Sequence, residues 1–239
     1  MTAPAFTHLG EVGSTNDWLL ERAVGLADDH WVITDRQTAG RGRRGRAWGD
    51  GAGNLMASVM VRAKGAVQQL SFVAALALLK ALEETTRQGP ESPAPRFFLK
   101  WPNDVLLDGV KVSGILLERA GNALIIGFGA NLAQHPGDTE RPATSLAAAG
   151  LAVPTPMDML ARLMPAFVHY RRLWEDEGFE AIRTLWLARA AGLGERVTAR
   201  LGTETLEGRF EGLAADGALT LRTDDDSLRA IHAGEVFAL

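Results

Sequence analysis

The chain has 239 residues, of which 46% are hydrophobic, and this is enough apolar material for one large domain with a small companion. Its 25 basic and 29 acidic side chains leave a net charge of -4, so the chain as a whole gives no electrostatic reason to expect binding to DNA or to an anionic membrane. Cysteine is absent, which excludes disulfides, thiolate metal sites and a cysteine nucleophile.

Residues 14–128 predict a mixture of helices and strands. A short helix is expected from Ser14, which can cap it and is followed three residues later by Asp17. Apolar residues at i, i+3 and i+4 predict a core-facing helix over residues 67–87, ended by a proline-rich connection at 89–95. Apolar runs predict strands at residues 31–34, 55–61, 97–101, 110–118 and 123–128, the fourth entered through an Asp-Gly turn at 108–109.

The last third of the chain changes character. Residues 156–191 are helical in pattern, with breaks expected at Pro165 and Gly178. Short strands divided by turn residues then follow at 197–201, 206–213, 218–222 and 230–238, a spacing typical of a small barrel or sandwich. We therefore predict an α/β domain over residues 1–192 and a small β domain over 193–239.

Residues 40–46 place four arginines and three glycines in one short loop of an acidic chain. Glycine lets the backbone approach a ligand, and arginine offers forked donors that suit phosphate or carboxylate oxygens, so the loop is a candidate oxyanion clamp. The alternative is a solvated basic loop. The glycines also match G-x-G-x-x-G, but residues 47–51 cannot begin the helix that a dinucleotide fold needs, and no Walker loop occurs in the chain.

Two lysines and a carboxylate converge near the hairpin of residues 97–118. When a carboxylate attacks an α-phosphate, a cation between the two anions lowers the barrier, a role that suits Lys111. An amine acceptor must instead lose a proton, and Asp104 could place or deprotonate it. The alternative is ordinary turn chemistry with a lysine at a strand end. Gly114, inside an apolar strand, favours close approach by a ligand.

A second glycine turn, residues 127–131, ends in Asn131 and could line a pocket, although a plain turn gives the same pattern. The five histidines are scattered without the spacing of metal ligands, so we predict no metal site made by the protein.

Four blocks occur in a fixed order along the chain. They are Ser14-Thr15-Asn16, residues 40–46 with Trp48, residues 100–104 with 111–115, and Gly127, Gly129 and Asn131. Together they resemble the motifs of the biotin protein ligases, and the resemblance spans essentially the whole chain. It implies a mixed-sheet α/β catalytic domain of the type shared with lipoate ligases, followed by a small SH3-like β-barrel.

The resemblance also implies roles for individual residues. Lys111, Arg43 and Asp104 match catalytic positions. The positions that match the biotin pocket are Ser14, Thr15, Asn16, Gln37, Gly40, Arg41, Gly114 and Gly127. The positions that match the ATP and adenylate site are Arg41, Gly42, Arg43, Arg46, Trp48, Asn103, Lys111 and Asn131.

The implied reaction uses ATP and Mg²⁺ to convert biotin to biotinyl-5'-AMP, and then transfers biotin to a lysine of a biotin carboxyl carrier protein. The sequence shows no signal peptide and no apolar run near the roughly 20 residues of a membrane span, so we expect a cytoplasmic protein. The alternatives are a lipoate or octanoate ligase, which the arginine loop and terminal β domain disfavour, and a biotin-sensing module without catalysis.

Two positions depart from the pattern of some family members. The first block begins at Ser14, which leaves no room before it for the DNA-binding domain of bifunctional members, so we expect no DNA binding. Met56 stands where some members place an aromatic residue beside biotin.

Edge strands near Leu116 or in the terminal β domain could pair with the acceptor or form a homodimer.

Overall fold

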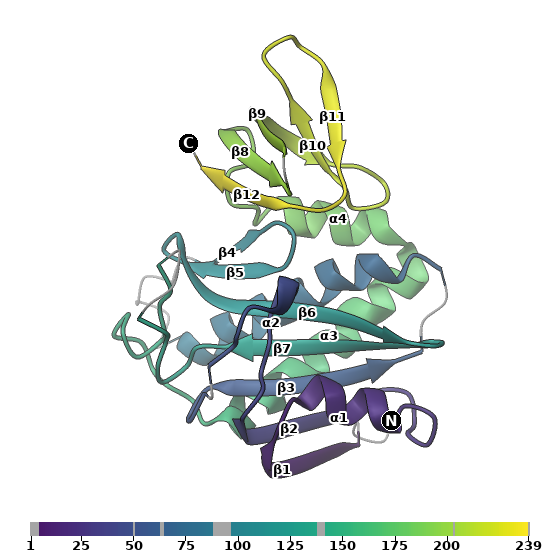
Figure 1. Cartoon of the computed structure of the whole chain (residues 1–239), viewed down its shortest axis with the longest axis vertical. Helices are drawn as coiled ribbons and strands as arrows, with labels where there is room; N and C mark the ends of the chain where they lie inside the picture. Colours follow the sequence, from purple (N-terminus) through teal and green to yellow (C-terminus); the bar gives the residue numbers. More distant parts are fainter. Residues whose placement is uncertain are drawn as a thin grey trace.

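The computed structural model describes residues 5–49, 51–62, 65–87, 97–137, 142–202 and 204–238. Its larger part is built on a seven-stranded mixed sheet with the strand order β1-β2-β3-β7-β6-β5-β4 (Figure 1). The β1–β2 pair is parallel and the other five pairs are antiparallel. The strands are β1 (Phe6–Val12), β2 (His30–Gln37), β3 (Leu55–Val61), β4 (Phe97–Lys100), β5 (Asp104–Leu107), β6 (Val110–Ala120) and β7 (Ala123–Ala130).

Helices cover both faces of this sheet. The helical elements are α1 (Thr15–Arg22), α2 (Leu70–Thr86), α3 (Pro156–Glu177) and α4 (Phe179–Leu187), with 3-10 turns η1 (Arg43–Gly45) and η2 (Val67–Gln69). Successive side chains of a strand point to opposite faces, so Trp31 and Ile33 share a buried cluster with α2 and α3, while Val32 packs with α1. Trp31 stacks on Phe128 with ring centroids 5.5 Å apart and meets Phe167 of α3 edge-on at 5.6 Å.

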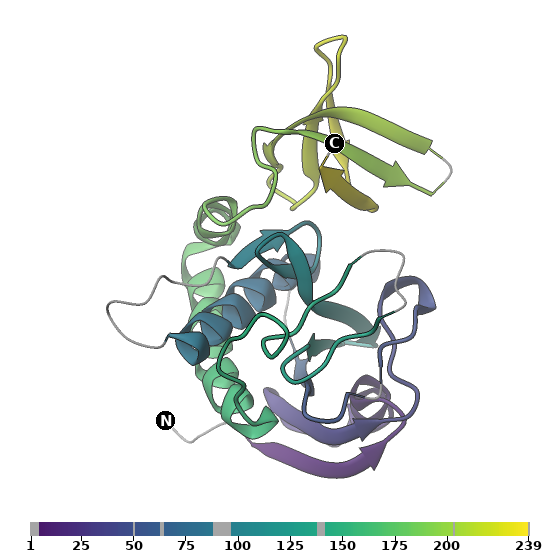
Figure 2. The same cartoon turned by 90° about the vertical axis from the view of Figure 1, so that its left-hand side faces the viewer.

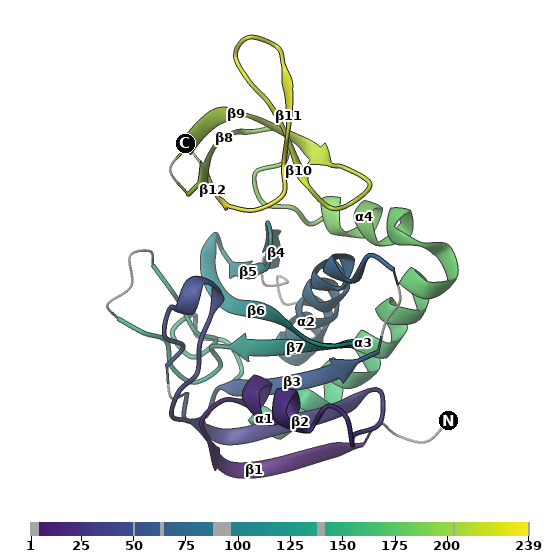
Figure 3. The same cartoon turned by 45° about the vertical axis from the view of Figure 1, so that its right-hand side comes forward.

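The C-terminal part forms a five-stranded antiparallel sheet in the order β11-β10-β9-β8-β12. In Figure 2 this part, coloured green to yellow, lies above the larger part of the molecule. Its strands are β8 (Arg196–Leu201), β9 (Glu204–Leu213), β10 (Leu219–Arg222), β11 (Leu228–Ile231) and β12 (Glu235–Ala238). Helix α4 leads to this sheet, which lies beyond the β4–β5 end of the large sheet (Figure 3). Every strand of it follows residue 195, which supports our proposed division of the chain at residues 192–194.

Side chains of the large part hold the small sheet in place. The indole nitrogen of Trp101 donates a hydrogen bond to the Gly217 carbonyl at 3.1 Å, and the side-chain amide of Gln69 donates to the Ala215 carbonyl at 3.1 Å. The Phe72 ring also contacts Phe179 of α4, with centroids 5.3 Å apart. The motif at residues 100–104 therefore faces two ways, since its tryptophan contacts the small sheet while Asn103 and Asp104 face the cavity described below.

The predicted α/β class is confirmed, and most helices and strands lie where their patterns indicated. The Ser14 hydroxyl accepts the backbone N–H of Asp17 at 3.4 Å, as the capping signal predicted. The predicted break at Pro165 is wrong, because α3 continues through it to Glu177. The last helix ends at Leu187 rather than at 191, and residues 67–69 form a 3-10 turn ahead of α2.

Several strands differ from the prediction. Strands β1 and β5 were not predicted; the residues of β5 lie between the strand predicted at 97–101 and the Asp-Gly turn at 108–109. Residues 230–238 form parts of two strands, β11 and β12, instead of one. An edge strand near Leu116 is wrong, because β6 is paired on both sides and the edges of the large sheet are β1 and β4. The connection predicted at residues 89–95 lies outside the described residues.

Among the described residues, none of the helices has both the length and the apolar character that crossing a membrane would require.

Candidate functional site

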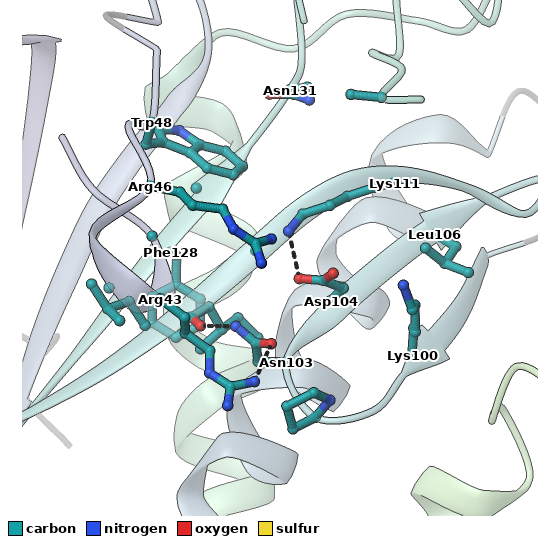
Figure 4. A pocket seen from close by; sticks show the side chains of 18 of the residues that line it. Arg43, Arg46, Trp48, Lys100, Asn103, Asp104, Leu106, Lys111, Phe128 and Asn131 are labelled. Carbon is teal, nitrogen blue, oxygen red and sulfur yellow. Dashed lines mark hydrogen bonds and ion pairs between the residues drawn. The ribbon is translucent and has the colours of Figure 1, made fainter. Parts of the chain in front are cut away.

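A cavity of about 1040 Å³ opens beside the ends of β6 and β7 (Figure 4). Its walls come from the glycine-arginine loop (residues 40–46), the β4–β5 turn, the start of α1 and strand β12 of the small sheet. The cavity brings together all the predicted site residues except Gly40. Those that line it are Ser14, Thr15, Asn16, Gln37, Arg41, Gly42, Arg43, Arg46, Trp48, Asn103, Asp104, Lys111, Gly114, Gly127 and Asn131.

Lys111 and Asp104 face each other across the β5–β6 hairpin (Figure 4). The Lys111 Nζ lies 2.7 Å from Asp104 Oδ1, in an ion pair whose carboxylate is 16% exposed. Gly114 is directly opposite Asp104 in the strand register. A Cβ at Gly114 would lie 3.4 Å from Lys111 Nζ, 3.4 Å from Trp48 and 3.6 Å from Asp104 Oδ1, so the missing side chain keeps the space among these three groups open.

Trp48 lies over two glycines of neighbouring strands. A Cβ at Gly129 of β7 would stand 2.5 to 2.8 Å from three atoms of the indole, and the Trp48 ring centroid is 6.0 Å from Lys111 Nζ. Gly129 is paired with Gly114 of β6 in the register, so the two glycines form one flat surface under the ring. The glycines of this strand pair therefore give an aromatic side chain room to lie flat in the cavity.

The glycine-arginine loop is a small folded hairpin. Arg41 and Ala47 form an antiparallel bridge, Gly42 N–H donates to the Arg46 carbonyl at 2.7 Å, and Trp48 N–H donates to the Gly40 carbonyl at 2.9 Å. Gly40 itself is buried, and a Cβ there would lie 2.7 Å from Gln37 Nε2. The backbone of the loop is therefore held by hydrogen bonds both before and after its 3-10 turn.

Arg41 is tied to the body of the protein by two carboxylates. Its guanidinium donates to both Asp17 oxygens at 2.6 Å and to Glu118 Oε1 at 2.9 and 3.2 Å. The hydrogen bond from Arg41 holds the pKa of Asp17 below its usual range, and the same partners raise the pKa of Arg41. Arg41 therefore fixes the loop to α1 and β6.

Arg43 lies deeper than the other loop arginines and has weaker partners. Its Nη1 is 3.4 Å from Asn103 Oδ1, and Asn103 Nδ2 donates to the Ile115 carbonyl at 2.5 Å (Figure 4). Burial lowers the pKa of Arg43, and the neighbouring charge of Arg44 acts in the same direction. A cation in such a place is stabilised by an arriving anion.

The small sheet contributes Glu235 of β12 to the cavity. Its carboxylate contacts the guanidinium of Arg46 and lies 3.8 Å from Arg44 Nη1. Burial alone would raise the pKa of Glu235, but the two arginines hold it below its ordinary value. The glycine-arginine loop is therefore bound to the small sheet as well as to the large one.

A chain of buried polar groups, the pocket network, lies at the end of the cavity formed by α1. Gln37 Oε1 accepts Thr15 N–H at 2.8 Å, and the Thr15 and Ser58 hydroxyls are 2.7 Å apart. Ser58 donates to Asn16 Oδ1 at 2.6 Å, and Asn16 Nδ2 donates to Glu118 Oε2 at 2.7 Å. A Cβ at Gly127 would lie 2.5 Å from Asn16 Oδ1, so this glycine makes room for the amide.

Two asparagines organise the loop that follows β7. Asn131 is buried, and its Nδ2 donates to the Thr144 carbonyl at 3.0 Å. Asn54 Oδ1 accepts the backbone N–H groups of Leu132, Ala133 and Gln134 at 2.9 to 3.2 Å. Asn131 therefore lines the cavity and also fixes the segment at Thr144 by a hydrogen bond.

Four residues at the site were missed by the sequence analysis: Asp17 as a partner of Arg41, Ser58, Glu118 and Glu235. Ser58 had a signal, because it is the single polar residue of the otherwise apolar β3. Glu118 also had one, because it follows Gly114 by four residues and so shares its face of β6.

Met56, the position that departs from some family members, is buried. A Cβ at Gly51 would lie 2.7 Å from its Sδ, so the Met56 side chain packs against that glycine.

Comparison with known proteins agrees with this geometry. Residues 11–131 match the model of the biotin/lipoate A/B protein ligase family, and residues 192–239 match the biotin protein ligase C-terminal domain. The biotin--[acetyl-CoA-carboxylase] ligase of Paracoccus denitrificans is 45% identical over 96% of this chain and 98% of its own.

Solved structures give the same result. The biotin protein ligase from Aquifex aeolicus in complex with biotin and ATP superposes with a TM-score of 0.84 at 29% identity, covering 98% of this chain and 99% of that one. The enzyme from Leishmania major in complex with biotinyl-5-AMP gives a TM-score of 0.70 at 26% identity, covering 97% of this chain and 100% of that one. The chain belongs to the biotin protein ligase family.

Proposed function

We propose that this protein joins biotin to ATP and then transfers the biotinyl group to a lysine of a carboxyl carrier protein. In the first step a biotin carboxylate oxygen attacks the α-phosphorus, and pyrophosphate leaves. In the second step the acceptor amine attacks the acyl carbon, AMP leaves, and the amine gives up a proton. The proposal depends on one observation above all, the ion pair of Lys111 and Asp104 over Gly114 in the same cavity as the glycine-arginine loop.

The ion pair suggests an order of events. Lys111, 38% exposed, would turn from Asp104 toward the biotin carboxylate and the α-phosphate and reduce the repulsion between these two anions. That movement would leave Asp104 unpaired and able to receive the acceptor ammonium and its proton. One lysine would thus serve the first step, and its departure would prepare the carboxylate for the second.

The other residues that line the cavity are assigned to the parts of the ligands that they would contact. We propose that Arg43, which is partly buried beside Asn103 and accompanied by Arg46, contacts the phosphate. Trp48 would cover the adenine, and Asn131 would contact the nucleotide. The biotin rings would lie against Ser14, Thr15, Asn16 and Gln37, with Gly40, Arg41, Gly114 and Gly127 giving room or backbone contacts. Gly42 would contact the adenylate.

Magnesium would arrive bound to the triphosphate. Among the described residues, no group of three or more acidic or histidine side chains is placed so that it could hold a metal ion, and no step is assigned to magnesium. A cytoplasmic location, a carrier protein as acceptor and a homodimer are further proposals, which rest on the sequence.

The first experiment measures the intact mass of an apo biotin-carrier domain after incubation with the protein, MgATP and biotin, beside a sample given lipoate. The expected result is a gain of one biotinyl group, on one lysine, in the biotin sample. A gain with lipoate alone would keep the fold and change the substrate. No gain in either sample, with biotin still bound, would leave a binding module.

Arg43→Gly should release the adenylate faster, by about 10-fold to 100-fold, which corresponds to the loss of one or two charge-assisted hydrogen bonds. Released adenylate would then label lysines on bystander proteins. Arg44→Gly is the matched comparison, because it removes the same charge one residue later, at a φ of 58° that glycine adopts readily. The measurements are adenylate release by rapid filtration and labelling of serum albumin. Equal release by both variants would remove the specific role of Arg43.

A further inference from the structure

The pocket network begins with a group that can only accept hydrogen bonds. Glu118 is 25% exposed and pairs with the Arg41 guanidinium, so its side chain is a carboxylate without a proton to donate. Its Oε2 lies 2.7 Å from the Asn16 amide, which must therefore present its NH₂ to Glu118. The opposite side of that amide, Oδ1, is an acceptor, and it faces Ser58 at 2.6 Å.

This orientation fixes the protons further along the network. Ser58 has one hydroxyl proton, and Asn16 Oδ1 takes it. The contact of 2.7 Å between Ser58 and Thr15 then needs the proton of Thr15. Thr15 also lies 3.1 Å from Gln37 Oε1, and with either partner its proton is engaged inside the protein. The hydroxyl is left with a lone pair for a ligand.

Gln37 is oriented from the other end. Its Oε1 accepts the backbone N–H of Thr15, a donor that cannot reverse, so its NH₂ points away from Thr15. The pocket network thus presents one acceptor, the Thr15 oxygen, beside one donor, the Gln37 amide. A ureido group is the complement of this pair, since it carries N–H donors next to a carbonyl acceptor.

We propose that Glu118 is a positioning residue that sets the direction of hydrogen bonding from Asn16 through Ser58 to Thr15. The Thr15 oxygen then accepts from the ureido group of biotin, beside the Gln37 amide, which the Thr15 backbone N–H holds as a donor. The proposal rests on the proposed function, because it takes biotin as the ligand. Glu118 acts through Asn16 and Ser58. If its carboxylate were replaced by an amide, the Asn16 side chain could turn over and the protons of Ser58 and Thr15 could reverse with it.

A competing explanation is that Glu118 matters only as an anchor of Arg41. Asp17 separates the two, because it also accepts from Arg41, at 2.6 Å through both oxygens, whereas the Asn16 amide bonds to Glu118 and Ser58. Asp17→Asn should therefore weaken the anchor and leave the network in place.

The experiment compares four variants: Glu118→Gln, Asn16→Asp, the double variant that exchanges the two groups, and Asp17→Asn. Glu118→Gln should raise the KM for biotin about 10-fold, the effect of one misdirected buried hydrogen bond, with kcat at saturating biotin and the KM for ATP within about twofold. Asn16→Asp places two carboxylates face to face, so it should raise the KM for biotin further than Glu118→Gln does. In the double variant, the new amide at position 118 donates to the new carboxylate at position 16, which still accepts from Ser58. The KM for biotin should then return to within about threefold of the original.

Melting temperatures accompany the kinetics, so that a variant that fails to fold is recognised. An unchanged KM for biotin in Glu118→Gln, a double variant no better than either single one, or an equal rise in Asp17→Asn would overturn the proposal. The original protein separates this failure from that of the proposed function, because the latter would appear as no biotin-dependent mass gain on the carrier.

Discussion

Lys111→Ala should stop pyrophosphate release from biotin and MgATP, with a fall in kcat of at least about 100-fold. The reason is electrostatic, since the attack joins a carboxylate to a phosphate, and we propose that the Lys111 ammonium, which lies 3.4 Å from the Cβ position of Gly114, reduces their repulsion. Binding of biotin alone should change little, because the pocket network does not include Lys111. The measurements are coupled pyrophosphate release and calorimetric titration with biotin.

Lys80→Ala is the control for this variant. Lys80 is a lysine of α2 whose Nζ lies 3.0 Å from Glu84 one turn away, so its loss removes the same charge without touching the cavity. Normal pyrophosphate release by Lys111→Ala would exclude this lysine from the first step. A loss of biotin binding together with activity would instead place Lys111 in substrate binding.

Gly129→Ala should raise the KM for ATP at least about 10-fold, equivalent to about 1.4 kcal/mol, while the protein stays folded. The new methyl group would stand 2.5 to 2.8 Å from three atoms of the Trp48 indole, so the ring must leave its position. Trp48 is only partly buried and can move, and alanine accepts the strand backbone, so the damage should be local to the nucleotide site.

Two comparisons test whether this effect acts through the indole. Trp48→Ala should also raise the KM for ATP, and the double variant should be no worse than the stronger single one, because both act on the same contact. Gly10→Ala is the matched glycine control, since it lies in β1 with no atom within 4 Å of a new Cβ. Additive effects of Gly129→Ala and Trp48→Ala would show that the glycine acts in some other way.

The sequence indicated where the cavity would lie but not how its side chains contact each other. Gly114 and Gly127 marked places where something must come close, yet a strand glycine does not show what approaches. In the structure these are side chains of the protein itself, Trp48 at Gly114 and Asn16 at Gly127. The motifs also identified the arginines of the loop but not the carboxylates that bind them. Glu118 follows its partner Arg41 by 77 positions and Glu235 follows its partner Arg46 by 189, so no local pattern links them.

Local patterns also explain the errors in the fold. Strand β5 has four residues between two tight turns, too few for a period to be visible, and its pairing with β4 and β6 decides its structure. Pro165 lies inside α3 because tertiary packing outweighs its local cost, as neighbouring Leu163 and Phe167 are fully buried. In both cases strand pairing or packing, which a local pattern does not show, decides the structure.

The hairpin form of the glycine-arginine loop affects how much order a ligand must impose. Fixing the backbone of a free residue costs about 1 to 2 kcal/mol in conformational entropy, so seven free residues would weaken binding by many orders of magnitude. Here the Arg41–Ala47 bridge and the bonds at Gly40 and Gly42 already fix much of that backbone. Closing over the adenylate would then immobilise mainly arginine side chains, so tight retention is compatible with a short loop that is rich in glycine.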